Sequence, residues 1–591
     1  MQDKAPEYGS DVIFDTFRAM GIKFVSLNPG ATTRGLHDSI VNYGGNKNPE
    51  LILCCHEGIA VAIASGYFRA THQPMVVLLH DIAGLLHATK AIFDAWINRD
   101  AMIVIGGNGP VDIQKRRPWI DWIHNALIPN TMVRDFVKWD DQPSDLFATL
   151  EDLIRSRGIA LTEPTGPVFI SIDAGIQEAK LEAIPDIPKP ESHSFPSVDE
   201  GSVAKLSEAA KVLSSAEHPV IITNNYGRDD NSIANLVDLA QQLGAIVLDS
   251  GARFNFPNTN PLNLSGLEES TLAEADVVLA LGVKDLYFHL ARRDAGFYSR
   301  LSTLMIRPDC EIIRIDLEGF YQKSWVSEYG RLTPTSLYIP ARPDAAVVTL
   351  LELCRKELQS LDQDHEIKAR ISVIKDRYFE LRKKWRDIVS NSLNKHPPGY
   401  PALAAIAWET LRDKDWVLAF PGYSMRGINA WLRRTWEITR CYQYPGRGEG
   451  TGTGTGQALG VALANVGKFC IDFQPDGDLL YSASSLWTAA HCKIPLLIIM
   501  MNDRSYHNDE EHNKFISMER NRSEESSKIG IRIEEPNVDF GQMARSFGIG
   551  SSGVVDTANS LREALKEGAS VVSKGRPYLV DVLVQQSQTF S

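Results

Sequence analysis

The stretch that decides the fold spans residues 474–508 and is QPDGDLLYSASSLWTAAHCKIPLLIIMMNDRSYHN. Its pattern predicts the end of a strand, an acidic turn, a helix, a second strand and a second polar turn. Asp476 and Asp478 flank Gly477 in the first turn, and Asp503 follows the second strand. Because the carboxyl ends of neighbouring parallel strands meet at one edge of a sheet, we expect these acidic side chains to gather at a ligand-binding edge.

The residue types at this edge suit a hard cation bound to a phosphorylated ligand. Two carboxylates and a backbone carbonyl are ligands that Mg²⁺ accepts, and phosphate oxygens and water fill its other positions. Gly477 lets the backbone approach a ligand, and the N-terminus of the following helix favours a diphosphate. An Asp-Gly-Asp triplet alone is more often a solvated turn, so the prediction depends on the second polar turn, which follows the adjacent strand.

The same alternation of short apolar runs and amphipathic stretches fills most of the chain. The predicted strands lie at 23–27, 51–55, 75–79, 102–105 and 167–171, at 220–223, 245–248, 276–281, 311–315 and 337–339, and at 416–420, 469–473, 496–501 and 578–582. Near-continuous apolar strands are typical of parallel sheets covered by helices on both faces. We therefore predict an α/β protein of three domains, each a mainly parallel sheet flanked by helices.

Composition changes along the chain suggest where these domains begin and end. A proline-rich stretch at 184–196 predicts an extended linker, and a charged stretch without strand signals predicts helices before the last block. We expect a first domain at 1–185, a middle Rossmann-like domain at 195–345, a helical linker at 346–395 and a third domain at 396–591.

The quoted segment resembles the fingerprint of thiamine-diphosphate-dependent enzymes, in which Gly-Asp-Gly is followed farther along by Asn-Asn. The inner stretch SLWTAAHCKIP is especially similar to benzoylformate decarboxylase, in the group that also contains acetolactate synthase and pyruvate decarboxylase. Pro475 replaces the first glycine of the fingerprint, and Asp503 replaces its second asparagine. Since aspartate also ligates magnesium, the resemblance implies thiamine diphosphate and Mg²⁺ as cofactors, with Asp476, Asp503 and the carbonyl of Ser505 as metal ligands. It also implies that the first domain binds the pyrimidine and the third the diphosphate.

Glu57 is the candidate for the glutamate that activates the cofactor in this family. It follows the apolar run LILCC and opens the helical run GIAVAIASGYFRAT. In the family a carboxylic acid bound to the aminopyrimidine ring nitrogen drives the amino group into an imino form, which deprotonates the thiazolium carbon. An acidic residue in the first turn of a helix is also favoured by the helix dipole alone, but the magnesium motif favours the catalytic interpretation.

Two histidines are candidate catalytic residues beside Glu57. His80 ends the apolar run MVVLL, and HDIAGLLHATKAIFDAW resembles the benzoylformate decarboxylase segment in which a histidine faces the substrate. His289 follows the strand in VVLALGVKDLYFHL, where that enzyme has its other active-site histidine. Histidine suits proton delivery near neutral pH, although a lone histidine after a strand is usually structural. We interpret His56, next to Glu57, as structural.

Two further turns resemble the family's cofactor cradle. GRGEGTGTGTGQALGVALA, at 446–464, is a glycine-rich loop that enters a helix, and PGYSMRG, at 421–427, follows a predicted strand. Neither matches the GxGxxG context of a dinucleotide site, so NAD is rejected. Thr451 stands where the family has a bulky apolar residue under the thiazolium ring. The resemblance implies a cofactor-binding set of Glu57, Tyr423, Ser424, Gly450, Thr451, Asp476, Gly477, Asp478, Asp503, Ser505 and Tyr506.

The substrate side is expected near the N-terminus and after Asp503. Asn28, Pro29 and Gly30 resemble the family's substrate-side turn, in which Ala31 replaces a frequent serine. We therefore assign Gly30, Ala31, His80 and His507 to the substrate side. His507, Asn508, Asp509 and His512 stand where benzoylformate decarboxylase has apolar and aromatic residues, which indicates a more polar pocket or a solvated surface helix.

Composition excludes some classes of function. The net charge of −13 argues against nucleic acid and anionic membranes as partners, since both require a basic surface. No run of about 18 apolar residues predicts a membrane span, the N-terminus lacks a signal-peptide pattern, and seven sparse cysteines suit a reducing cytoplasm. FAD occurs in some related middle domains, but no fingerprint in this chain requires it.

The leading functional prediction is a decarboxylase or carboligase that acts on a 2-oxo acid. An acyloin or 2-hydroxyacyl lyase that releases no CO₂ is the enzymatic alternative, and a non-catalytic binding or regulatory homologue is the alternative of another class. Pro475, Thr451 and Asp503 favour the non-catalytic alternative, whereas Glu57 argues against it. The expected partners are a small 2-oxo acid or acyloin and further copies of the chain. The resemblance implies a homodimer or homotetramer with sites at the subunit interface.

Overall fold

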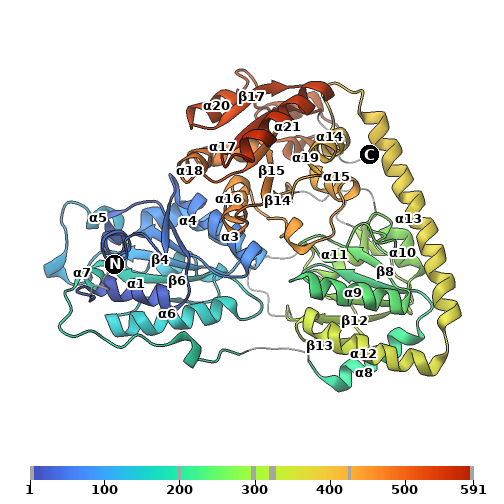
Figure 1. The fold of residues 1–591 in the computed structure, drawn as a ribbon, viewed down its shortest axis with the longest axis horizontal. Helices are drawn as coiled ribbons and strands as arrows, with labels where there is room; N and C mark the ends of the chain where they lie inside the picture. Colours follow the sequence, from blue (N-terminus) through green and yellow to red (C-terminus); the bar gives the residue numbers. More distant parts are fainter. Residues whose placement is uncertain (1–4, 197–200, 295–300, 319–327, 424–426, 586–591) are drawn as a thin grey trace.

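Three parallel sheets form the framework of the computed structural model, which describes residues 5–196, 201–294, 301–318, 328–423 and 427–585. The sheets contain six, five and five strands, and every strand pair within them is parallel. Figure 1 shows the first sheet in blue and teal, the second in green, and the third in orange and red. The predicted α/β class with three helix-flanked sheets is confirmed.

The first sheet has the strand order β2-β1-β3-β4-β6-β5. Its strands are β1 (Phe24–Leu27), β2 (Glu50–Leu53), β3 (Val76–His80), β4 (Ile103–Asn108), β5 (Asp140–Asp141) and β6 (Val168–Asp173). The α-helices around it are α1 (Gly9–Ala19), α2 (Arg34–Asp38), α3 (Glu57–Thr71), α4 (Asp81–Asn98), α5 (Asp121–His124), α6 (Leu146–Leu161) and α7 (Ala174–Glu178). The apolar side chains of β3 and β4 are fully buried, as expected for strands covered on both faces.

The second sheet has the order β13-β12-β9-β7-β8. It contains β7 (Pro219–Thr223), β8 (Ile246–Asp249), β9 (Val277–Leu281), β12 (Glu311–Asp316) and β13 (Leu337–Pro340), beside an antiparallel pair, β10 (Ala291–Arg293) and β11 (Ser302–Leu304). Its helices are α8 (Val203–Ser215), α9 (Asp230–Leu243), α10 (Glu268–Glu274), α11 (Leu286–Leu290) and α12 (Pro343–Leu361). Leu350 and Cys354 of α12 are buried in the core of this sheet, so α12 packs as part of the middle unit.

The third sheet has the order β14-β15-β16-β18-β17. Its strands are β14 (Trp416–Phe420), β15 (Phe469–Pro475), β16 (Leu497–Asn502), β17 (Gly550–Val555) and β18 (Tyr578–Leu583). Its helices are α14 (Tyr400–Leu411), α15 (Ile428–Thr435), α16 (Gly454–Ala464), α17 (Asp476–Tyr481), α18 (Ser485–His491), α19 (His507–Glu519), α20 (Phe540–Ser546) and α21 (Ala558–Val572). The long helix α13 (Asp364–Ser392) runs along the side of the molecule and connects the second unit to this one (Figure 1).

Glycines hold the first and third units of the chain against each other. A Cβ atom added to Gly66 of α3 would lie 1.9 Å from the backbone oxygen of Gln457 in α16. One added to Gly460 of α16 would lie 2.0 Å from the backbone oxygen of Ile63 in α3. Backbones this close leave no room for a side chain at Gly66 or Gly460. Through this contact α3 and α16 hold the first unit against the third.

No helix within the described ranges is long and apolar enough to cross a membrane.

Candidate functional site

Asp476 and Asp503 lie at the carboxyl edge of the third sheet. β15 and β16 are parallel neighbours with Pro475 opposite Met501, so the residues that follow these strands meet at one edge. Asp476 begins α17 and is buried. Its Oδ1 accepts the backbone N–H of Gly477 at 2.7 Å, and its Oδ2 accepts that of Arg504 at 2.7 Å. Asp503 Oδ1 accepts the N–H of Ser505 at 3.2 Å.

The electrostatics of this pair suit a bound cation. Burial raises the pKa of Asp476 to about 6. Burial and the nearby Asp476 carboxylate raise the pKa of Asp503 to about 8. Two neighbouring carboxylates repel each other, and a cation that lies between them stabilises both in the ionised form. Their oxygen donors are the type that Mg²⁺ accepts, so the residues fit the metal that the sequence motif predicts.

Asp478 organises the glycine-rich loop. Its Oδ1 accepts the hydroxyl of Tyr423 at 2.6 Å and also the N–H of Gly452, and its Oδ2 accepts the N–H of Gly454 at 3.3 Å. These bonds connect the turn after β14, the loop before α16 and the start of α17. Ser424, the neighbour of Tyr423, lies outside the described residues.

A cavity of about 920 Å³ opens over this edge. Most of the predicted cofactor residues line it, together with three that were expected in a polar pocket: Tyr423, Gly450, Thr451, Asp476, Gly477, Asp478, Asp503, Ser505, Tyr506, His507, Asn508 and Asp509. His512 is not among its lining residues. A Cβ atom at Gly477 would lie 2.6 Å from the ring of Tyr506, so glycine is required there for that ring to approach.

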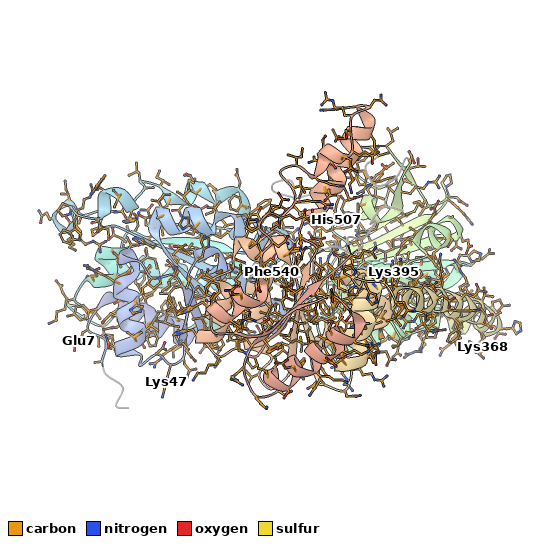
Figure 2. All side chains as sticks on the ribbon, turned by 90° about the horizontal axis from the view of Figure 1, so that it is seen from above. Glu7, Lys47, Lys368, Lys395, His507 and Phe540 are labelled. Carbon is orange, nitrogen blue, oxygen red and sulfur yellow. The ribbon has the colours of Figure 1, made fainter. Side chains whose placement is uncertain are left out.

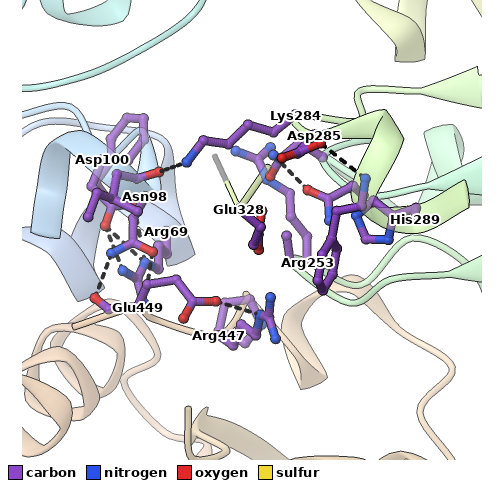
Figure 3. A pocket seen from close by; sticks show the side chains of 17 residues that line it. Arg69, Asn98, Asp100, Arg253, Lys284, Asp285, His289, Glu328, Arg447 and Glu449 are labelled. Carbon is purple, nitrogen blue, oxygen red and sulfur yellow. Dashed lines mark hydrogen bonds and ion pairs between the residues drawn. The ribbon is translucent and has the colours of Figure 1, made fainter. Parts of the chain in front are cut away.

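His289 of α11 also lines this cavity and reaches a second one, of about 310 Å³, at the junction of the three units (Figure 3). Burial and the nearby Arg447 guanidinium lower the pKa of His289 to about 4, so its imidazole is neutral. Arg447 is itself paired with Glu449 at 2.9 Å, and the backbone N–H of Glu449 donates to Asn98 of α4. Charged and polar groups of the first and third units therefore contact one another at the second cavity.

Glu57 opens α3 at the edge of the first sheet. Its side chain is 8% exposed and accepts a hydrogen bond at Oε2 from Nδ1 of His87, 3.0 Å away in α4. A Cβ atom at Gly84 would lie 3.2 Å from Oε1 of Glu57. The carboxyl group is thus enclosed by α3 and α4, with His87 as its polar neighbour.

His80 ends β3 beside Glu57. Its Nδ1 lies 2.9 Å from the hydroxyl of Thr32, and its ring centroid lies 4.3 Å from that of His124. Burial, with a further contribution from His124, lowers the pKa of His80 below its usual value. A Cβ atom at Gly30 would lie 2.2 Å from the His80 side chain, so the predicted substrate-side turn packs directly on this ring. The carbonyl of Ala31 accepts a hydrogen bond from Arg117.

The predicted site residues fall into two groups. Asp476, Asp503, His289 and His507 line one cavity, and all the described residues that line it come from position 222 onward. Glu57, at the start of α3, and His80, at the end of β3, belong to the first unit and do not line that cavity. Within one copy of the chain, the candidate residues around Glu57 and those around Asp476 do not share this cavity, and we call them the N-terminal and the C-terminal half-site.

Sequence reasoning missed three residues of these half-sites. His87 contacts Glu57, His124 contacts His80, and the buried carboxylate of Glu510 accepts the hydroxyl of Ser505 at 3.0 Å. Local sequence could not find the first two contacts, because each joins residues on different elements. Glu510 lies in the polar run after Asp503, in α19, which projects from the body of the molecule near His507 (Figure 2).

Comparison with known proteins agrees with this arrangement. Residues 8–131 match the family model "Thiamine pyrophosphate enzyme, N-terminal TPP binding domain", and residues 428–582 match "Thiamine pyrophosphate enzyme, C-terminal TPP binding domain". The chain is 22% identical to the acetolactate synthase large subunit of Haemophilus influenzae, with 98% of this chain and 95% of that protein covered. It is 23% identical to benzoylformate decarboxylase of Pseudomonas aeruginosa, with 93% and 96% covered.

Solved structures share the fold over nearly the whole chain. A thiamine diphosphate-dependent 4-hydroxybenzoylformate decarboxylase from Rhodococcus jostii superimposes with a TM-score of 0.76 at 20% identity, covering 98% of this chain and 100% of that one. Benzoylformate decarboxylase from Polynucleobacter necessarius gives 0.76 at 17% identity, with the same coverage. With both cofactor-binding domains matched in the expected order, the chain belongs to the thiamine-diphosphate-dependent enzymes of the acetolactate synthase and benzoylformate decarboxylase type.

Proposed function

We propose that this chain binds thiamine diphosphate and Mg²⁺ and acts on a 2-oxo acid, as a decarboxylase or carboligase. The observation that carries the proposal is the pair Asp476–Asp503 at adjacent strand ends, of which Asp476 is buried and Asp503 half-buried. The raised pKa values of the pair suit a site that holds a divalent cation. The relatives named above support the reaction class, since acetolactate synthase and benzoylformate decarboxylase are among them.

In the C-terminal half-site the two aspartates and the carbonyl of Ser505 would hold the metal, and Gly477 would let the diphosphate approach. The hydrogen bonds of Asp478 with Tyr423 and Gly452 would hold the glycine-rich loop against the diphosphate. When bound, thiamine diphosphate supplies a carbon nucleophile that adds to a carbonyl group and accepts the electrons of the neighbouring bond. The protein would bind and orient the cofactor and the substrate and would transfer protons.

In the N-terminal half-site Glu57 would hold a proton at its carboxyl oxygen and share it with the aminopyrimidine ring nitrogen. Its side chain is 8% exposed and lies between α3 and α4. His80, from the first sheet, and His289, from the second, would face the substrate as neutral imidazoles, which can both donate and accept a hydrogen bond.

We infer that two copies of the chain complete each site. Glu57 and His80 do not line the cavity that contains Asp476, which supports an arrangement in which the two half-sites meet across an interface between copies. The segment that carries His124 also exposes large apolar side chains: Trp119 is 71% exposed and Trp122 76%. Exposed aromatic residues beside a half-site are typical of a surface that a second copy covers.

Guanidinium groups of the cavity wall would offer binding positions to a substrate carboxylate, beside acidic lining residues such as Glu328 and Glu449. Arg293, Arg434 and Arg447 line the cavity, and guanidinium groups bind carboxylates well. A 2-oxo acid carries that group beside the reacting carbonyl.

The direct test is a panel of 2-oxo acids and aldehydes incubated with the protein, thiamine diphosphate and Mg²⁺, with CO₂ and products followed by mass. We expect CO₂ release from at least one 2-oxo acid, and loss of that release in Glu57→Gln, which keeps the size of the side chain but cannot carry the proton. Cleavage of acyloins without CO₂ would instead establish the lyase reaction. Thiazolium-proton exchange as fast in Glu57→Gln as in the parent protein would remove Glu57 as the activator.

A further inference from the structure

Three potential metal ligands meet at the N-terminal half-site. The imidazoles of His56 and His87 and the carboxylate of Glu57 place their ligand atoms within 4.8 Å of one another. We call these three residues the His56 cluster. His87 Nδ1 lies 3.0 Å from Glu57 Oε2, and the rings of His56 and His87 stack with centroids 5.1 Å apart. The sequence interpretation of His56 as a purely structural residue did not anticipate this cluster.

The chemistry of the cluster differs from that of the aspartate edge. Two imidazoles and one carboxylate form a donor set that zinc uses in open sites, where the fourth position stays free for water. Magnesium prefers oxygen donors alone, as at Asp476 and Asp503. The two sites of one chain should therefore select different cations.

A bound metal would replace hydrogen bonds that the cluster makes without it, among them the one between His87 Nδ1 and Glu57 Oε2. His56 caps α3, and its Nδ1 accepts the N–H of Gly58 at 3.0 Å, so the neutral ring carries its proton on Nε2. A metal would therefore displace either the Gly58 N–H from Nδ1 or the proton from Nε2. Burial lowers the pKa of His56, so the neutral form that metals require is favoured. The His87 side chain is 60% exposed, so an ion can enter from solvent and the ring can turn from its stacked position toward the ion.

We propose that the His56 cluster is a binding site for Zn²⁺ or a similar transition-metal ion, and that its occupation blocks Glu57. The blocking rests on the proposed function, because a carboxylate that ligates a metal is no longer free to share a proton with the aminopyrimidine ring. Magnesium would thus support the enzyme at one half-site, while zinc would inhibit it at the other.

The first experiment measures binding without any catalytic readout. Zn²⁺ is titrated calorimetrically into the cofactor-free, full-length Asp476→Ala protein, in which the aspartate edge has lost a ligand. We expect His87→Ala in the same background to weaken zinc binding by about 100-fold or more, since losing even a partner outside the coordination sphere costs roughly 10–100-fold. His365→Ala, which removes an exposed histidine on α13, is the matched control and should bind zinc unchanged. If the protein binds zinc with equal affinity with and without His87, the His56 cluster is not the zinc site.

The second experiment tests the blocking, with Asp476 intact and excess Mg²⁺ present. The rate of each protein with zinc is divided by its own rate without zinc, because His87 contacts Glu57 and its removal can change the zinc-free rate. By this ratio zinc should slow exchange of the cofactor's thiazolium proton in the parent protein and in His365→Ala, and much less in His87→Ala. Suppose that Glu57→Gln exchanges the thiazolium proton slowly, whereas the zinc-saturated parent protein exchanges it at the zinc-free rate. That result would contradict the proposal that bound zinc blocks Glu57. If Glu57→Gln exchanges at the parent rate, the failure lies in the proposed role of Glu57, and the zinc affinities still decide the site.

Discussion

Asp476 and Asp503 show how burial prepares a pair of residues for a cation. Both carboxyls are enclosed at the edge of the third sheet, and hydrogen bonds from backbone N–H groups only partly offset the cost of burying their charge. The metal-free pair therefore binds protons that a metal must displace. The affinity of such a site depends on pH because protons and the cation compete for the same oxygens.

Magnesium affinity should fall as the pH is lowered from about 8 to about 6, by up to roughly tenfold per pH unit for each proton displaced. Because both folded-state pKa values are raised, the stability that these groups contribute is complete below about pH 4 and is lost as the pH rises through about 6 to 8. Added Mg²⁺ should then raise the melting temperature more at pH 8 than at pH 6. Calorimetric titration and thermal unfolding at both pH values measure these effects.

Asp476→Ala should bind neither Mg²⁺ nor metal-dependent cofactor. Asp509→Ala, which removes an exposed carboxylate that lines the same cavity, should behave like the parent protein. A Mg²⁺ affinity that does not change with pH, or that survives in Asp476→Ala, would place the metal elsewhere.

His80 should serve the substrate and leave cofactor activation unchanged. His80→Ala is expected to lower turnover by about 10²–10⁴-fold, the usual contribution of a positioned proton donor, while thiazolium exchange stays nearly normal. Because burial and His124 lower its pKa, the limb of the pH–rate profile that disappears should lie below about pH 6.5. His37→Ala, on exposed α2, is the control. If exchange collapses together with turnover, His80 shapes the cofactor site instead.

At the scale of elements, the sequence pattern was sufficient to predict the strands that are buried on both faces. The predicted strand at 416–420 has the observed bounds of β14, and the rule for parallel strand ends brought Asp476 and Asp503 together. β17 was missed because its sequence, GSSGVV, alternates polar and small residues at the sheet edge, and β5 because it has two residues. The contacts of His87 and His124 arise from packing between elements, which periodicity does not report.

The contact between α3 and α16 should depend on its glycines. Gly66→Ala would place a methyl group 1.9 Å from the backbone oxygen of Gln457, where no flexible side chain can yield. We expect a loss of about 1–3 kcal/mol, as for other overpacked contacts, and a lower melting temperature. Gly399→Ala, whose added Cβ atom would meet only Pro401 at 3.6 Å, is the matched control. Equal melting temperatures for the two variants would show that this interface yields easily.

At the scale of the whole molecule, the three units build two half-sites that do not meet within one copy. The first sheet carries Glu57 and His80, whereas the second and third sheets enclose the cavity with His289 and the aspartates. The locked contact between α3 and α16 fixes the two half-sites in one rigid chain. In the symmetric dimer that we propose, the N-terminal half-site of each copy would meet the C-terminal half-site of the other.

Complementation between two inactive variants tests this central claim most directly. Glu57→Gln and Asp476→Ala chains are coexpressed with different tags, the mixed assembly is purified, and thiazolium-proton exchange is measured with thiamine diphosphate and Mg²⁺. In a mixed dimer one of the two sites contains Glu57 from one chain and Asp476 from the other, so we expect roughly half the exchange activity of the parent dimer, while each variant alone stays inactive. Mixed dimers as inactive as the single variants, although correctly folded, would show that the site does not form between copies.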